Sequence, residues 1–172
     1  ELTCVKDPEL DVYVYGLSYY DREIREGLYD KAVPVQEEGI HILLAHGGDL
    51  SCCPMEFTGL AAAGFDYVAL GHSHKPHTVC RDKIAYSGSL EPLDRNDLGK
   101  HGYIQGEYED GNVKVRLVPC ANRSYQNLVL NVDRDTTQYK LEEMLRSEVM
   151  RRGGRNIYRL ILKGRVSPDN VL

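Results

Sequence analysis

The stretch Asp66-Tyr67-Val68-Ala69-Leu70-Gly71-His72-Ser73-His74-Lys75-Pro76 decides the fold, because an apolar strand runs directly into a Gly-His-x-His turn. In an extended backbone, side chains two residues apart point to the same side, so His72 and His74 can present their imidazoles to one pocket. That pocket would lie just past the carboxyl end of the strand, where α/β sheets bind ligands. A solvated turn is the alternative for an isolated His-x-His pair.

A second apolar strand delivers another histidine. The run Ile40-His41-Ile42-Leu43-Leu44-Ala45-His46 is followed by Gly47-Gly48, two residues that permit a close backbone approach to a ligand. Residues 54–64, between the two strands, have the pattern of a short helix, and a strand-helix-strand crossover makes its strands parallel neighbours. We therefore expect His46, His72 and His74 to converge at one edge of a sheet. His41, at the start of its strand, is expected to be solvated.

The composition fits one ordinary core, or one core with a small satellite. The chain has 172 residues, of which 42% are hydrophobic and 27% are charged. The net charge of −5 argues against a protein that coats nucleic acid through bulk electrostatics, so any DNA contact needs a local basic face. No stretch approaches the roughly 20 apolar residues that span a bilayer.

The cysteines do not follow the spacing of a disulfide framework. Five are present, an odd number that includes the adjacent pair Cys52-Cys53, which suggests reduced thiols and a cytoplasmic compartment. A zinc site drawn from Cys52, Cys53, Cys80 and His77 is an alternative. No Cys-x-x-Cys pair supports it, and small buried cysteines are common.

The remaining segments predict short strands and one longer helix. Residues 12–19 form a first strand; residues 83–86, 102–108 and 112–118 form a second, antiparallel sheet, with Asp110-Gly111 in a hairpin turn. A β-α-β unit follows. Its strands cover residues 127–132 and 157–162, and its helix begins at a capping-box variant, Asp135 with Gln138, and ends at Gly153-Gly154.

Four blocks of the sequence resemble a known family. They are Leu43-Leu44-Ala45-His46-Gly47, Tyr67-Val68-Ala69-Leu70-Gly71-His72-Ser73-His74-Lys75-Pro76, Tyr86-Ser87-Gly88-Ser89-Leu90-Glu91-Pro92-Leu93 and Gly102-Tyr103-Ile104-Gln105-Gly106-Glu107. Together they are similar to the later motifs of calcineurin-like metallophosphoesterases. The Gly-His-x-His block is common to that superfamily, whereas the Ser-Gly-Ser-Leu-Glu-Pro block resembles the SbcD-type DNA-repair exonucleases.

The resemblance implies an α/β fold. Residues 1–120 would be part of a two-sheet metallophosphoesterase β-sandwich with flanking helices, followed by a small β-α-β capping-type domain that begins in residues 125–172. It also implies a hydrolase, a DNA exonuclease or endonuclease in DNA repair that works with an SMC-like ATPase subunit. Two divalent metal ions would clamp and polarise the phosphodiester, with manganese as the expected metal and iron or zinc as alternatives. His46 and His72 would bind one ion, and His74 the other.

The sequence departs from the family in its opening motifs. Such enzymes carry an Asp-x-His block, a bridging Asp and a Gly-Asn-His block, and none of these occurs here. We therefore expect the chain to be the C-terminal part of a longer protein, with no catalytic residue assigned within it and little activity alone. Exposed sheet edges would favour a homodimer. A phosphoesterase acting on nucleotides or phosphoproteins, and a non-catalytic module that binds DNA or a partner, are the alternative functions.

Several further residues are candidates for contacts around the site. Asp49 could orient a ligand histidine, or cap a loop. Ser87 and Ser89 could approach the substrate phosphate, or merely connect two strands. The basic stretch between Arg146 and Arg165 could contact DNA phosphates, or be a solvated helix end favoured by the helix dipole. Its candidate DNA-binding residues are Arg151, Arg152 and Arg155.

Overall fold

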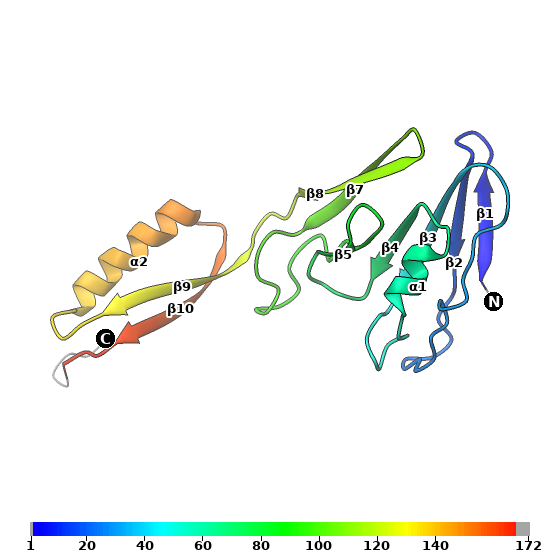
Figure 1. Ribbon diagram of the computed structural model, residues 1–172. Coiled ribbons are helices and arrows are strands. Elements are labelled where there is room, and N and C mark those ends of the chain that lie inside the picture. The colour runs from blue at the N-terminus through cyan, green and yellow to red at the C-terminus, as the bar shows by residue number, and fades with distance from the viewer. Residues whose placement is uncertain (1, 168–172) are drawn as a thin grey trace. The chain divides into compact units, whose positions relative to one another are not determined.

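The structure, a computed structural model, describes residues 2–167, so positions 168–172 of the predicted capping-type domain lie outside the described residues. The described chain divides into two compact units (Figure 1). Residues 2–90 and 101–120 make up the first unit, and residues 91–100 and 121–167 make up the second. Among the described residues, the first unit contains two sheets and the second unit contains one.

The first unit is built on a six-stranded mixed sheet with the order β1-β2-β3-β4-β6-β5 (Figure 1). The four central strands β2, β3, β4 and β6 are parallel, and the edge strands β1 and β5 run antiparallel to their neighbours. The strands are β1 (Thr3–Asp7), β2 (Val12–Gly16), β3 (Ile40–His46), β4 (Tyr67–Gly71), β5 (His77–Cys80) and β6 (Ile84–Tyr86). The fold is therefore mixed α/β, as the sequence predicts.

The predicted crossover between the two histidine-bearing strands is present. Helix α1 (Phe57–Ala62) connects β3 to β4, which pair in parallel. Glu56 caps the helix by accepting hydrogen bonds from the amides of Thr58 and Gly59. Burial of apolar surface holds the sheet in place, because this effect contributes about 25 cal/mol per Å². The fully buried side chains include Leu43, Phe65, Val68 and Ile84.

The structure corrects the predicted position of β6. This strand pairs in parallel with β4 in the main sheet, instead of joining the second, antiparallel sheet. Three residues are too short a run to display a period of two, so the sequence pattern carries no information on the strand's partner.

The second sheet consists of the hairpin β7 (Gly102–Glu109) and β8 (Asn112–Pro119), which turns at Asp110-Gly111 as predicted. A cavity of about 420 Å³ separates this hairpin from the main sheet, and its wall is largely apolar. It includes Ile42, Tyr67 and Ala69 from the main sheet and Ile104 and Val115 from the hairpin. The two layers are thus present, while the predicted family sandwich is not confirmed.

The second unit contains a β-α-β arrangement. Strands β9 (Tyr125–Val132) and β10 (Ile157–Gly164) pair in parallel, and helix α2 (Gln138–Arg152) connects them. Leu128 and Leu130 are the buried residues of β9. The helix begins at Thr137, whose hydroxyl accepts a hydrogen bond from the amide of Lys140, and not at the predicted Asp135 cap. It ends at Gly153, as predicted.

Neither helix of the described residues has the length and hydropathy to span a membrane.

Candidate metal centre

The register of two parallel strands brings the first pair of histidines together. His46 is the last residue of β3 and lies opposite Gly71, the last residue of β4. His72 follows at once, so both imidazoles stand at the carboxyl end of the sheet. Their ring centroids are 5.3 Å apart, in an edge-to-face arrangement. Burial and the neighbouring His72 lower the pKa of His46, which favours the neutral imidazole that metals bind.

His72 adopts a backbone conformation that few side chains tolerate. Its φ angle is +103°, in the region that favours glycine. Such conformations cost about 1–3 kcal/mol and persist where the surrounding structure requires them. The turn after β4 therefore holds an imidazole at a place where the backbone alone would prefer glycine.

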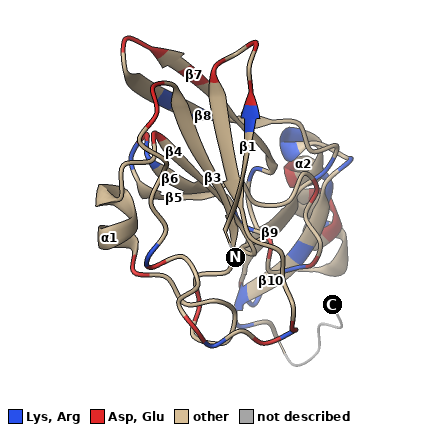
Figure 2. Cartoon of the chain, turned by 90° about the vertical axis from the view of Figure 1, so that its right-hand side faces the viewer, with Lys and Arg blue, Asp and Glu red and all other residues tan. Residues whose placement is uncertain are grey.

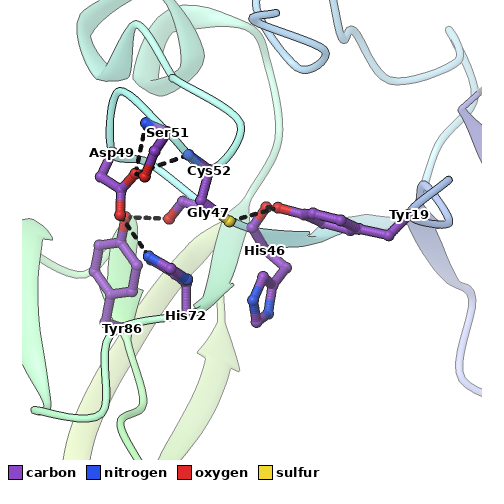
Figure 3. A network of polar contacts seen from close by, with 8 residues as sticks. All are labelled: Tyr19, His46, Gly47, Asp49, Ser51, Cys52, His72 and Tyr86. Atoms are coloured by element: carbon purple, nitrogen blue, oxygen red, sulfur yellow. Dashed lines mark hydrogen bonds and ion pairs between the residues drawn. The ribbon is translucent and has the colours of Figure 1, made fainter. Parts of the chain in front are cut away.

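Asp49 fixes the ring of His72. Nε2 of His72 donates to Oδ2 of Asp49 over 2.6 Å, since a carboxylate can only accept (Figure 3). The other carboxylate oxygen accepts from the amide and hydroxyl of Ser51 and from the amide of Cys52. The contact with His72, followed by those with Ser51, holds the pKa of Asp49 well below its usual value. Asp49 is thus both a loop cap and a partner of the histidine, and Nδ1 of His72 is left to bind a ligand.

The two glycines after His46 pack closely against other residues of the protein, whereas the sequence suggested a close approach to a ligand. Gly47 and Gly48 have φ angles of +130° and +108°. A Cβ atom on Gly48 would lie 2.0 Å from the hydroxyl oxygen of Tyr86. That hydroxyl donates to the carbonyl of Gly47 over 2.7 Å (Figure 3). The glycines therefore fold the loop that positions Asp49.

The side chain of Cys52 lies close to His46 and His72. One ligand atom each of His46, Cys52 and His72 lies within 4.8 Å of the others. Metal–nitrogen and metal–sulfur bonds of about 2.0–2.3 Å place tetrahedral ligand atoms roughly 3.3–3.8 Å apart, so these donors need to move together by at most about 1.5 Å. Imidazole nitrogens and a thiolate are ordinary ligands of a transition metal. The donor set fits one metal ion once these side chains move closer together.

His74 is placed beside this group and not within it. The residue is exposed, and its carbonyl accepts from the amide of Ser89 over 2.9 Å and from the Ser89 hydroxyl. Ser89 also contacts Nδ1 of the buried His101 through its carbonyl and its hydroxyl. Ser87 donates its amide to the carbonyl of Leu70. The two serines thus stabilise the turn that carries His72 and His74 through hydrogen bonds. Their contact with a substrate stays a prediction.

The structure does not assemble the alternative zinc set. Among residues 2–167, the group of metal-ligating atoms includes Cys52 but none of Cys53, Cys80 and His77. Cys53 is fully buried, and His77 stacks on Tyr86 with ring centroids 4.5 Å apart.

The expectation that His41 is solvated is wrong. It is 6% exposed, stacks on Tyr13, and contacts the Tyr15 hydroxyl and the Glu37 carbonyl through its two ring nitrogens. Its partners come from β2 and from the loop before β3, which a pattern along a single strand does not reveal.

A cavity adjoins the candidate metal centre. It encloses about 380 Å³ and is lined by His72 and Asp49 together with the aromatic rings of Phe57, His77 and Tyr86. Aromatic walls beside a few polar groups are typical of small-ligand sites.

The candidate DNA-binding arginines lie in the second unit. Arg151 and Arg152 both form ion pairs with Glu148, at 2.7 and 2.8 Å. Arg152 also donates to the carbonyl of Asn127. Arg155 is exposed in the loop after α2. Figure 2 shows acidic as well as basic segments along α2.

The fold and the site together define a mixed α/β protein with a candidate metal centre at the carboxyl ends of adjacent parallel strands. The sequence is distantly homologous to a metallophosphoesterase. It is 24% identical over 170 residues to the uncharacterized metallophosphoesterase YhaO of Bacillus subtilis, and the match covers 92% of this chain. The chain spans 41% of that relative's length. No protein-family model matches the chain.

The sequence offered Cys52 only as part of the alternative zinc set, whereas the structure brings its sulfur near His46 and His72. The cysteine reaches the histidines because Gly47 and Gly48 reverse the chain and because the amide of Cys53 donates to the carbonyl of Ile24. The useful signal was the short separation of Cys52 from His46 in a loop that contains two glycines and Asp49.

Proposed function

We propose that the protein containing this chain is a metal-dependent phosphodiesterase, with DNA as its substrate. The observation that carries the proposal is the convergence of His46 and His72, with Asp49 behind His72, in a distant homologue of a metallophosphoesterase. Histidines held by a carboxylate at the carboxyl ends of parallel strands are suited to hold a metal beside a substrate.

The residues of this chain would position the metal and one side of the substrate. His46 and His72 supply nitrogen ligands, and Asp49 keeps Nε2 of His72 protonated so that Nδ1 carries the free lone pair. His74, exposed on the same turn, is the proposed ligand of a second ion. Two divalent ions, when bound, polarise a phosphodiester and supply a hydroxide at neutral pH. Manganese, iron and zinc all accept imidazole ligands.

The missing motifs limit what the chain does alone. Since the Asp-x-His, bridging Asp and Gly-Asn-His blocks are absent from this sequence, hydrolysis requires ligands from outside it. DNA contacts by Arg151, Arg152 and Arg155 of the second unit, pairing with an SMC-like ATPase and self-association through sheet edges belong to the same proposal. The edge strand β1, whose residues are all exposed, is where self-association would start.

A second candidate substrate is a small nucleotide. The aromatic cavity of about 380 Å³ beside His72 favours it, because the rings of Phe57 and His77 in its wall offer surface for a base. The two candidates differ in substrate and share the metal centre.

The test is metal-dependent hydrolysis by the protein expressed from its natural reading frame. Linear duplex DNA, bis(p-nitrophenyl) phosphate and a cyclic nucleotide are compared, each with manganese and with zinc. We expect DNA cleavage that His46→Ala and His72→Ala both abolish. Arg81→Ala, a change at a side chain that is 94% exposed, serves as the control and should leave cleavage unchanged.

Activity on the cyclic nucleotide without DNA cleavage would favour the second substrate. Binding of DNA without hydrolysis of any of the three compounds would contradict a phosphodiesterase and favour a binding module.

A further inference from the structure

The side chain of Cys52 is directed to the candidate metal centre by contacts on both sides. Its backbone amide donates to Oδ1 of Asp49 over 2.7 Å, and its carbonyl accepts from the amide of Gly48. Ile24 forms an isolated parallel bridge with Cys52. The backbone at this position is therefore held by two neighbouring segments.

Contacts with a neighbouring side chain also fix the position of the Cys52 sulfur beside the candidate metal centre. Sγ of Cys52 lies 3.2 Å from the hydroxyl of Tyr19, which itself donates to the carbonyl of His46 over 2.7 Å (Figure 3). Tyr19 thus links the cysteine to the residue that carries the first histidine. The same sulfur is one of the three donor atoms that lie within 4.8 Å of one another.

We propose that Cys52 is a metal ligand, which together with His46 and His72 forms a site with two nitrogens and one sulfur that prefers zinc to manganese. The inference rests on the proposed function in taking this place as the metal centre, and adds a ligand and a metal preference. On binding, the S–H bond breaks, the proton passes to solvent, and the sulfur lone pair forms the bond to the metal. No oxidant or reductant is required.

The preference follows from ligand chemistry. Thiolate is a soft donor that suits zinc, whereas manganese prefers carboxylate and water oxygens. Three protein ligands around zinc leave a fourth position, which is the arrangement of catalytic zinc sites. A water molecule or a phosphate oxygen can take that position. Tyr19 can stabilise the thiolate if its O–H proton turns from the His46 carbonyl to the sulfur, which lies 3.2 Å from the hydroxyl oxygen.

Cobalt(II) is the probe, because a thiolate bound to it gives a charge-transfer band in the near ultraviolet. The 172-residue chain is titrated with cobalt, and zinc or manganese is then added in competition. We expect the band in the unchanged chain, its loss with an equimolar amount of zinc, and its persistence with about a 100-fold excess of manganese.

Three variants assign the band. Cys52→Ser should abolish it and weaken zinc binding by about 100-fold or more, since changes even outside the ligand shell cost about 10–100-fold. Cys52→His should restore tight zinc binding without the band, which a purely structural role would not do. Cys120→Ser, a change at an exposed thiol, is the matched control and should keep both.

A cobalt complex of the unchanged chain that lacks the band would overturn the proposal, and this readout does not depend on whether any variant folds. A band that survives in Cys52→Ser would overturn it as well. The hydrolysis assay separates the two proposals: a thiolate band without phosphodiester cleavage leaves the ligand assignment standing, and cleavage without the band leaves only the proposed function.

Discussion

Oδ2 of Asp49 lies 2.6 Å from Nε2 of His72, although the two residues are 23 positions apart in the sequence. The contact determines which ring nitrogen of His72 carries the proton. It also ties the loop after β3 to the turn after β4, so it helps to hold the geometry of the candidate metal centre.

Asp49→Ala should therefore weaken metal binding without removing a ligand. We expect the zinc dissociation constant to rise about 10–100-fold, because the carboxylate no longer fixes the tautomer and orientation of His72. Isothermal titration calorimetry measures the effect. Asp49→Asn can still contact the His72 ring, so its zinc dissociation constant should lie between those of the unchanged protein and Asp49→Ala. Asp21→Ala, at an exposed aspartate, is the control; an equal loss of affinity in that variant would contradict a specific role for Asp49.

At position 72, a glycine variant should be more stable than an alanine variant, which is the reverse of the usual order. Because the φ angle of His72 is +103°, His72→Gly should be more stable than His72→Ala by about 1 kcal/mol. At His74, which is not among the residues with positive φ, the order should reverse. Urea denaturation of the four variants measures both differences. A glycine variant at position 72 that is less stable than the alanine variant would show that the turn does not carry this strain.

Gly48 and Tyr86 should be energetically coupled. A Cβ atom at position 48 would lie 2.0 Å from the Tyr86 hydroxyl oxygen, so Gly48→Ala should be strongly destabilising. Tyr86→Phe removes that oxygen, and the double variant should recover part of the loss. The recovery is partial because Gly48 has a φ angle of +108°. A double-mutant cycle of unfolding free energies gives the coupling, and strictly additive effects would contradict it.

The pKa of Glu148 gives a prediction for the second unit. Hydrogen bonds from Arg151 and Arg152 lower this pKa from its ordinary value of 4.5. A lowered pKa in the folded state stabilises the fold at pH values above the pKa of the unfolded state, and this contribution is lost as the pH falls through the folded-state pKa. The stability difference between the protein and Glu148→Gln should thus shrink with acidification. Carbon-13 NMR should report a pKa below 4.5 that moves up in an Arg151→Gln/Arg152→Gln variant; no movement would exclude the arginines as its cause.

Periodicity and turn chemistry predicted much of the fold. The apolar runs that became β3 and β4, the Asp110-Gly111 hairpin and the stop of α2 at Gly153 are all local patterns. The edge strands β1 and β5 were not predicted, because β1 is exposed at every position and β5 has four residues. A strand that buries no side chain leaves no hydrophobic pattern in the sequence.

The candidate site was only partly predictable for a related reason. His46 and His72 stand at strand ends, and their meeting follows from parallel pairing. Cys52 lies in a loop whose path depends on glycine conformations and on contacts with Tyr19. These are contacts between segments distant in sequence, which no local pattern encodes.

The pairing of His46 with Gly71 at the last register position of β3 and β4 has a kinetic consequence. His46 and His72 are separated in sequence by helix α1, strand β4 and the connecting loops, so they meet only when β3 and β4 have paired. A metal ion in the refolding buffer then has no complete site to bind until that step is over. During refolding, metal binding should therefore lag behind helix formation. A comparison of the two time courses would give the time at which the central strands pair.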